Sequence, residues 1–453
     1  MTDVLHVLLD GALIGEVRKA SRAGGTLSFV YDEAWRQNER AIPLSLSMPL
    51  AEAVHRDQII SAYMAGLLPD NENTLKQWGE RFHVSWRSPF ALLEHVGEDC
   101  AGAVQFVTGD RLVAMDQTQD EKRTVWLSDE EIGQRIADLR HGVVTGRRLG
   151  DPGQFSLAGA QAKTALLHDP DGNRWGVPTG RVPTTHILKP PMPGFSGHAE
   201  NEHFCLVLAR KLGMAAAASQ VLTFAGETVI VVRRYDRVRT GEGHLRRVHQ
   251  EDICQALGLP PDRKYEQAGG PGILRILAEV IPAAGRSAPL DALRFLEGCA
   301  YNFLIAGTDA HAKNFSMLLS SRGARLAPFY DLASILPHLK SGEVQMSGGQ
   351  VAGFRDLKLA MKVDSKYPLQ DIMPRHWEAL ARKARLATHA AIDYIRHQIA
   401  VLPDLAADVA AECAASGLSH PIIQSLPDCI AERAADLKPI YGSEALSEAA
   451  LPR

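Results

Sequence analysis

A short polar stretch, residues 307–315, places an aspartate and an asparagine close together after a long apolar helical pattern. Asp309 and Asn314 are five positions apart, and a further carboxylate, Asp331, follows a strand-like segment. A carboxylate can take the proton of a hydroxyl group. An amide oxygen and a second carboxylate are the oxygen ligands that Mg²⁺ prefers. The spacing therefore predicts that Asp309 is a base and that Asn314 and Asp331 hold magnesium.

The same separation of aspartate and asparagine occurs in the catalytic loop of protein kinases, where a later aspartate also holds magnesium. Such a site needs a cation for the ATP phosphates. Lys189 ends an alternating strand pattern, and Glu202 lies in the helical pattern that begins about eleven residues later. A strand lysine and a helix glutamate position the phosphates in kinases. Without the stretch around Asp309, an ordinary strand lysine and an exposed helix acid would be the better interpretation.

A second stretch, Gly153–Leu167, is rich in small residues and leads into an apolar strand pattern. Backbone N–H groups of such a turn can approach phosphate oxygens, and Lys163 can add a charge. Ala160 and Gln161 belong to the same turn. The stretch lacks the Walker A pattern, and by itself it is best interpreted as an ordinary hairpin.

Residues 1–50 have a β-rich pattern, and further short strand patterns, with helical patterns between them, follow up to about residue 235. They include a hairpin signal at Asp10-Gly11 and the apolar run Thr228–Val232. Residues 109–128 are polar, which predicts a loop or a boundary. The run at Thr228–Val232 leads into Arg233 and Tyr235, where a strand ends and a linker begins, as at the adenine-binding hinge of a kinase.

Helical spacing prevails after about residue 249. The pattern of Leu290–Ile305 predicts a buried helix that delivers the chain to the polar stretch. Phe315–Leu319 and Arg325–Pro328 then predict a hairpin. A hairpin there would bring Asp331 back beside the residues that precede it, as a shared magnesium site requires.

Composition is that of an ordinary globular protein. The 453 residues are 45% hydrophobic and 23% charged, with a formal net charge of −4. This balance gives no general attraction to nucleic acid or anionic membranes. No apolar run is long enough to span a bilayer, and no signal peptide is visible. The six cysteines are scattered, which is typical of reduced, buried thiols. We therefore expect a cytoplasmic protein.

Taken together, these motifs resemble the HipA family of bacterial serine/threonine kinases, the toxins of type II toxin–antitoxin modules. The likeness extends from the N-terminal region to about residue 400. The matching segments are Ser156–Leu167, Thr184–Lys189, Tyr235–Arg237, Gln250–Asp252, Tyr265–Ile273, Gly307–Ser316, Pro328–Asp331 and Asp356–Ala360.

The resemblance implies an α+β, two-lobed, protein-kinase-like fold with an N-terminal β-rich subdomain and a mostly helical C-terminal lobe. The expected domains are a β-rich subdomain, an N-lobe with the phosphate-covering loop, a helical C-lobe with the catalytic loop, and a tail. Their expected ranges are 1–110, 125–235, 236–440 and 441–453, respectively.

The resemblance also implies roles for single residues. Asp309 is then the catalytic base, Asn314 and Asp331 are magnesium ligands, Lys189 contacts the ATP phosphates, and Ser156 is autophosphorylated, which silences the enzyme. Further residues are expected at the nucleotide site, of which His311 is mainly structural. They are Ala160, Gln161, Lys163, Arg233, Tyr235 and His311.

Two features depart from the family pattern. Ala162 stands where the loop commonly has a glutamate, and Arg233 stands where a hinge glutamate is often found. Tyr235 follows in place of a phenylalanine. These departures leave the nucleotide geometry and the identity of the protein substrate open.

The expected function is that of an ATP- and Mg²⁺-dependent protein serine/threonine kinase that arrests growth. The family implies an aminoacyl-tRNA synthetase as substrate. Its implied partner is a HipB-like helix-turn-helix antitoxin dimer, which would bring the kinase to operator DNA indirectly. Two alternatives remain: an inactive scaffold that acts as a co-repressor, and a phosphotransferase for small molecules or lipids on the same fold.

Overall fold

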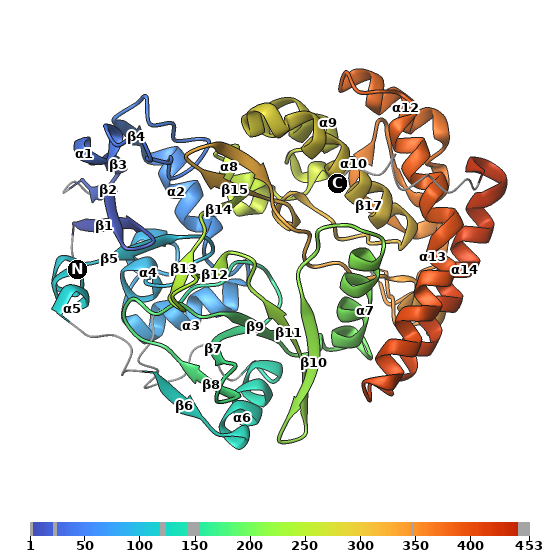
Figure 1. Ribbon diagram of the computed structural model, residues 1–453, viewed down its shortest axis with the longest axis horizontal. Helices are drawn as coiled ribbons and strands as arrows, with labels where there is room; N and C mark the ends of the chain where they lie inside the picture. Colours follow the sequence, from blue (N-terminus) through green and yellow to red (C-terminus); the bar gives the residue numbers. More distant parts are fainter. Residues whose placement is uncertain (1–2, 21–24, 118–123, 143–154, 347, 443–453) are drawn as a thin grey trace. The chain divides into compact units, whose positions relative to one another are not determined.

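The computed structural model describes residues 3–20, 25–117, 124–142, 155–346 and 348–442 (Figure 1). Within them the chain forms two compact units, each assembled from separate parts of the sequence. The first comprises Met1–Pro190, Thr223–Arg263 and Ser316–Ala324; the second comprises Pro191–Leu222, Lys264–Phe315 and Arg325–Arg453. No helix among the described residues is both long and apolar enough to cross a membrane.

The N-terminal part of the first unit is a five-stranded sheet in the order β4-β3-β2-β1-β5. Asp10 and Gly11 join the first two strands with positive φ angles of 47° and 83°. Both central residues of a tight hairpin turn need such angles, so the expected hairpin is confirmed. The strands are β1 (Val4–Leu9), β2 (Ala12–Lys19), β3 (Leu27–Tyr31), β4 (Val54–Arg56) and β5 (Val104–Val107).

Helices of the first unit pack their apolar side chains against this sheet. Tyr63 and Met64 of one helix and Phe90 and Leu93 of another share a core with Phe29 of β3. The helices that follow or precede the strands are α1 (Glu33–Arg36), α2 (Asp57–Gly66), α3 (Glu72–Phe82), α4 (Pro89–Val96) and α5 (Gly109–Gln117).

The loop expected over residues 109–128 is wrong in part. The segment contains α5 and, after residues outside the described part of the chain, strand β6. Strand β6 pairs with β8 through Val125 and Val177, although its side chains are partly exposed. Pairing with a distant strand fixed β6, and the polar composition of the segment gave no sign of that partner.

A second sheet of the first unit carries Lys189. Its strands run in the order β10-β11-β9-β7-β8-β6. The boundary between the two units falls within β10, after Leu222. Lys189 pairs with Ile230 in the β9–β11 ladder. The strands are β6 (Val125–Leu127), β7 (Thr164–Asp169), β8 (Arg174–Val177), β9 (His186–Lys189), β10 (Ser219–Phe224) and β11 (Glu227–Arg233).

The chain after β11 forms short paired strands. β12 (Arg237–Arg239) pairs with β13 (Leu245–Arg247), and β14 (Gln250–Asp252) pairs with β15 (Ser316–Ser320). β16 (Gly323–Leu326) follows β15 in the same sheet, which confirms the hairpin expected after the polar stretch. The first unit also contains α6 (Asp129–Arg140), which begins at the Ser128 cap, and α8 (Ile253–Ala256).

A buried cluster of charged residues links the two sheets inside the first unit. Arg234 donates to Asp236 at 3.0 and 2.9 Å and to the Cys100 carbonyl at 2.7 Å. Arg237 donates to Asp99 at 2.8 Å. Burial alone raises the pKa of Asp99, but Arg237, Arg234 and Arg247 outweigh it, so the net pKa lies well below the usual range. Asp99 is therefore ionised and neutralised at neutral pH.

The second unit is mostly helical. The long helices α13 and α14 lie side by side, and both pack against α7 (Figure 1). Its elements are α7 (His198–Lys211), α9 (Ile273–Arg275), α10 (Ala288–Leu304), α11 (Leu336–Lys340), β17 (Lys358–Val363), β18 (Lys366–Pro368), α12 (Pro374–Lys383), α13 (Ala390–Ala415) and α14 (Pro421–Tyr441).

Candidate active site

The polar stretch begins where the buried helix α10 ends. Ala306 has a φ of 52°, which turns the chain out of the helix. Gly307 then donates to the Asn302 carbonyl at 2.7 Å. A Cβ atom on Gly307 would lie 2.3 Å from Asn302 Oδ1, closer than atoms can approach. Any side chain at this position would force the Asn302 side chain to shift, and the tight exit carries the chain directly to Asp309.

Asp309 is exposed, which is compatible with the expected role of a base that meets an acceptor hydroxyl. Its Oδ1 accepts a hydrogen bond of 2.7 Å from the hydroxyl of Tyr265. The backbone is held beside it, because Ala312 N donates to the Lys264 carbonyl at 3.2 Å. The His311 ring is buried and lies edge-on to the Tyr265 ring at 4.9 Å.

The segments of Asn314 and Asp331 are tied together by a tyrosine. Tyr330 donates its hydroxyl proton to the Lys313 carbonyl at 2.7 Å. Lys313 precedes Asn314, and Tyr330 precedes Asp331, so this bond joins the two segments that carry the expected magnesium ligands. Asp331 is exposed and has a φ of 52°, an unusual conformation for a residue other than glycine.

These oxygen donors suit Mg²⁺, which is held in kinases by one or two side chains and completed by phosphate oxygens and water. Asn314 supplies an amide oxygen and Asp331 a carboxylate. Among the described residues, no three His, Cys, Asp or Glu side chains gather in a group that could hold a metal ion.

The chain beyond Asp331 is clamped to helix α7. Asn201 Nδ2 donates to the Ser334 carbonyl at 2.7 Å, and Ser334 N donates to Asn201 Oδ1 at 3.0 Å. Asn201 Nδ2 also lies 3.1 Å from His338 Nε2, and His338 Nδ1 lies 2.7 Å from Glu343. Asn201 and Ser334 are both almost fully buried. The amide side chain of Asn201 thus bonds both backbone groups of Ser334, as a neighbouring strand would do in a sheet.

The remaining expected nucleotide residues belong mostly to the first unit. Lys189 is 5% exposed. Lys163 Nζ donates to the Ala158 carbonyl at 2.8 Å, and Gln161 Nε2 donates to the Pro190 carbonyl at 2.9 Å. The second of these bonds ties the turn to the end of β9, so the turn that contains Ala160 lies beside the strand of Lys189.

Two further expected residues lie at the end of β11. Arg233 is exposed, and the Tyr235 hydroxyl donates to Gln250 Oε1. Glu202 of α7, in the second unit, is 2% exposed, which rules out the alternative that it is an exposed helix acid. The helical pattern around Glu202 did not reveal that this face of α7 is covered.

Ser156 is fully buried. Its hydroxyl donates to the Leu67 carbonyl at 2.8 Å, and its backbone N–H donates to the Asp99 carbonyl at 3.0 Å. Phe155 and Leu157 on either side are buried too. The expected loop begins at Gly153, and its first two residues lie outside the described part of the chain.

The structure thus gathers Asp309, His311, Asn314 and Asp331 in the second unit and the other expected nucleotide residues in the first. Sequence reasoning missed Tyr265, Tyr330 and Asn201, which hold the first group in place. Tyr265 and Tyr330 stood inside matching segments, and their hydroxyls were a signal that could have found them.

Comparison of the chain with known protein families identifies the family to which it belongs. Residues 5–107 match the domain described as "HipA N-terminal domain", and residues 155–406 match the "HipA-like C-terminal domain". The chain belongs to the HipA family.

Individual HipA relatives are similar in sequence over most of the length of this chain. The Sinorhizobium fredii protein Y4mE is 33% identical over 90% of this chain and 91% of its own. The serine/threonine-protein kinase toxin HipA of Shewanella oneidensis is 31% identical over 74% of this chain and 76% of its own.

A solved structure also agrees. It contains HipA, HipB and operator DNA from Shewanella oneidensis, and it matches with a TM-score of 0.77 and 25% identity over 97% of this chain and 98% of its own. This likeness confirms the α+β fold expected from the HipA resemblance.

Proposed function

We propose that this chain is an ATP- and Mg²⁺-dependent protein serine/threonine kinase and the toxin of a type II toxin–antitoxin pair. HipA family membership supports the kinase class. The single observation that carries the active-site assignment is the joining of the Asn314 and Asp331 segments by Tyr330 beside the exposed Asp309. An inactive scaffold has no physical need for that arrangement.

In this proposal each residue has one task. Asp309 orients the acceptor hydroxyl and takes its proton. Asn314 and Asp331 hold the magnesium that neutralises the phosphate charge, and Lys189 contacts the ATP phosphates from β9. Lys163, Gln161 and the backbone near Ala160 belong to the phosphate-covering loop.

Arg233, Tyr235 and His311 complete the proposed nucleotide surroundings, with His311 mainly supporting the loop around Asp309. The proposed domain ranges remain 1–110, 125–235 and 236–440, with a tail at 441–453. All but the first two residues of the tail lie outside the described part of the chain.

Autophosphorylation of Ser156 would silence the kinase. Its hydroxyl is a donor in a fully buried site and faces the Leu67 carbonyl. A phosphoserine carries about −1.5 to −2 charges and only acceptor oxygens around neutral pH. It would meet that carbonyl with repulsion and with the cost of burying charge. The loop would therefore leave its place once it is modified.

The test is intact mass after incubation with MgATP, starting from protein shown to be unphosphorylated. Wild type should gain one phosphoryl group on Ser156, and Asp309→Ala should gain none. Asp309→Asn is the matched control. It keeps the shape of the side chain and removes the charge of the carboxylate, and it should also gain no phosphoryl group. Absence of both transfer and nucleotide binding in wild type would favour the co-repressor scaffold. A substrate panel separates a protein kinase from a phosphotransferase of small molecules.

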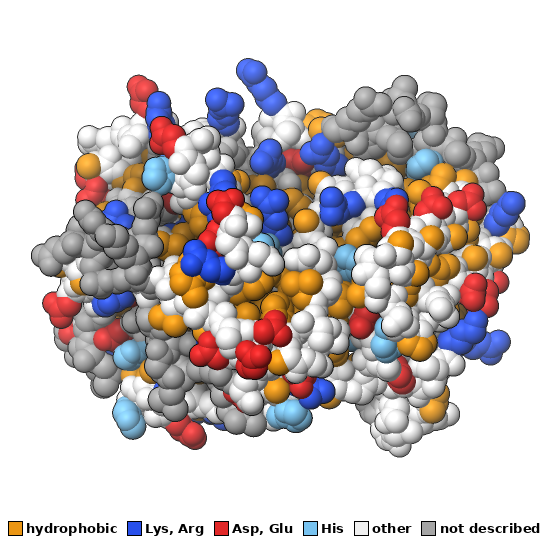
Figure 2. Space-filling view, turned by 60° about the horizontal axis from the view of Figure 1, so that its bottom comes forward, with side chains coloured by type: hydrophobic (Ala, Val, Ile, Leu, Met, Phe, Trp, Pro, Cys, Tyr) orange, Lys and Arg blue, Asp and Glu red, His pale blue; other side chains and the backbone are white. Residues whose placement is uncertain are grey.

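The proposed partner is a HipB-like helix-turn-helix antitoxin dimer, and the proposed place of action is the cytoplasm. The matched Shewanella complex contains HipA, HipB and operator DNA, which supports this partner. On the face shown in Figure 2, basic and acidic side chains are interspersed. That surface and the net charge of −4 support contact with operator DNA through the antitoxin.

The proposed substrate is an aminoacyl-tRNA synthetase, an expectation that rests on the family resemblance alone. Incubation of the kinase with a panel of purified synthetases and labelled ATP tests it. Transfer to one synthetase by wild type, and none by Asp309→Asn, would support the proposal. Transfer only to other proteins would exclude it.

A further inference from the structure

The hydroxyl of Tyr265 lies 2.7 Å from Oδ1 of Asp309. We propose that Tyr265 is a positioning residue, which orients the Asp309 carboxylate toward the acceptor hydroxyl. The assignment rests on the proposed function, in which Asp309 is the base. Tyr265 itself is 36% exposed, so its hydroxyl stands at the rim of the site and not in a closed core.

An aspartate carboxylate needs such a partner because the torsion angle that orients its carboxyl group has a broad distribution of allowed values. A free carboxylate can rotate and present either oxygen in many directions. The phenol donates to Oδ1 and so fixes the plane of the carboxylate. Oδ2 then keeps one orientation in which it can accept the proton of an incoming hydroxyl. Positioning of this kind contributes to catalysis without contact with the substrate.

The Tyr265 ring is itself held by its surroundings. It lies edge-on to the buried His311 ring, with centroids 4.9 Å apart and an interplanar angle of 80°. Lys264 Nζ lies 5.4 Å from its centroid. The Tyr265 carbonyl accepts bonds of 3.0 Å from both Ala268 N and Gly270 N. These contacts leave the hydroxyl little freedom to move away from Asp309.

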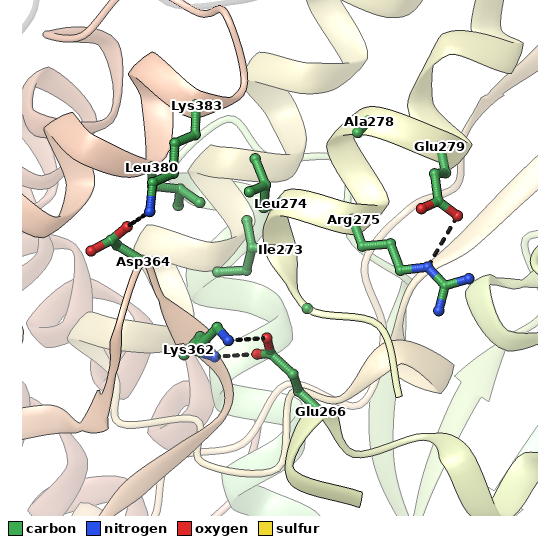
Figure 3. Close-up of a pocket in the computed structure, with 11 residues that line it drawn as sticks. Glu266, Ile273, Leu274, Arg275, Ala278, Glu279, Lys362, Asp364, Leu380 and Lys383 are labelled. Carbon is green, nitrogen blue, oxygen red and sulfur yellow. Dashed lines mark hydrogen bonds and ion pairs between the residues drawn. The ribbon is translucent and has the colours of Figure 1, made fainter. Parts of the chain in front are cut away.

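The next residue anchors this segment to a distant strand. Glu266 accepts a bond of 2.8 Å from Lys362 N of β17 and pairs with Lys362 Nζ at 3.2 Å (Figure 3). Both groups line a pocket of about 470 Å³ whose wall includes Ile273 and Leu274. A Cβ on Gly272 would lie 2.3 Å from the Glu266 carboxyl group, so a side chain there would push this carboxylate from its present place.

The segment around Tyr265 is therefore fixed at both ends. Lys264 accepts the backbone bond from the catalytic loop, and Glu266 is bound to β17. Rigidity at both ends is what a positioning group requires, since a mobile phenol would follow the carboxylate instead of orienting it.

The experiment compares Tyr265→Phe with wild type and with Tyr441→Phe. The first change keeps the ring against His311 and removes only the hydroxyl. Tyr441 donates to the Ile372 carbonyl at 2.8 Å, so its variant loses a hydroxyl bond of similar length within the same unit. Phosphoryl incorporation is followed in time at increasing MgATP, which yields a maximal rate and a half-saturating concentration.

Tyr265→Phe should lower the maximal rate about 10-fold, which corresponds to about 1.4 kcal/mol of transition-state stabilisation. The half-saturating MgATP concentration should stay within twofold of wild type, and Tyr441→Phe should keep both values. Glu266→Gln, which weakens the anchor but retains the hydroxyl, should lower the maximal rate by a smaller factor.

Three results would overturn the assignment. The first is a wild-type maximal rate in Tyr265→Phe. The second is a rise of its half-saturating MgATP concentration by the same factor as its maximal rate falls. The third is a wild-type protein that carries the phosphoryl group on Tyr265 itself. The last result would make the hydroxyl an acceptor. If wild type transfers no phosphoryl group at all, the proposed function fails and this assignment fails with it. Normal transfer by wild type and Tyr265→Phe alike removes this assignment alone.

Discussion

Replacement of Asn201 by alanine should weaken magnesium use, although Asn201 lies on α7 and far along the sequence from the proposed metal ligands. Its amide holds both backbone groups of Ser334, at 2.7 and 3.0 Å. Ser334 is three residues beyond Asp331. The clamp therefore fixes the end of the segment on which Asp331 stands in its unusual φ of 52°.

The expected loss of stability follows from what the alanine leaves behind. The Ser334 N–H and C=O are buried, and each loses its partner. A buried group without a partner costs about 1–3 kcal/mol. Water that enters the space left by the amide would recover part of this cost. We therefore expect Asn201→Ala to lower the free energy of unfolding by about 2–4 kcal/mol.

The catalytic effect is separable from this loss. With Ser334 released, part of the Mg²⁺ binding free energy must be spent on ordering the Asp331 segment. If ordering costs about 1 kcal/mol, the Mg²⁺ concentration at half-maximal transfer rises about fivefold. The assay is autophosphorylation against free Mg²⁺ at saturating ATP, at a temperature where circular dichroism shows both proteins folded.

Gln398→Ala is the matched control. Gln398 is a buried amide of α13 that donates to the Glu297 carbonyl at 3.4 Å. Its variant should lose stability and keep the wild-type dependence on Mg²⁺. A destabilised Asn201→Ala with an unchanged Mg²⁺ dependence would refute the reasoning and reduce the clamp to a purely structural role.

Three further outcomes are expected. Ser156→Asp should release the loop from the Leu67 carbonyl, and protease cleavage within 155–163 should be faster than in Ser156→Ala; equal cleavage would contradict this. Burial raises the pKa of Glu251 to about 8 from 4.5, so the folded chain keeps a proton that the unfolded chain loses. Stability should therefore fall from pH 4.5 to 8 by up to about 1.4 kcal/mol per pH unit, and thermal melts of Glu251→Gln should lack this component. Asp99→Asn removes one of the two carboxylates that neutralise the buried arginines and leaves only Asp236, so urea titration should show a loss of about 3–5 kcal/mol; a loss under 1 kcal/mol would show that the cluster relaxes.

The sequence predicted those parts of the structure that depend on neighbouring residues. The Asp10-Gly11 turn followed from the dihedral angles that only a few residue types accept, and the helix before Asp309 followed from apolar spacing. The hairpin before Asp331 was likewise local. These features are confirmed because each is decided within a window of a few residues.

Other features were decided by partners that the local pattern does not show. Strand β6 exists because β8 pairs with it, and Glu202 is buried although its helical pattern does not show it. The charged run Arg233–Arg237 was interpreted as a strand end and linker. In the structure, Arg234 and Arg237 are buried with Asp99, a residue more than 130 positions earlier. No window of sequence contains both sides of that interaction.

The same distinction separates the groups proposed to react from the groups that hold them. A base and two metal ligands must have certain types, and a tight loop keeps them at certain spacings, so a single sequence is enough to propose them. A positioning bond requires only that some donor reaches the right oxygen, from any direction along the chain. Tyr265, Tyr330 and Asn201 reach the site from three different segments. Their substitution should therefore affect catalysis in proportion to the bond lost, and sequence motifs alone would not have ranked them.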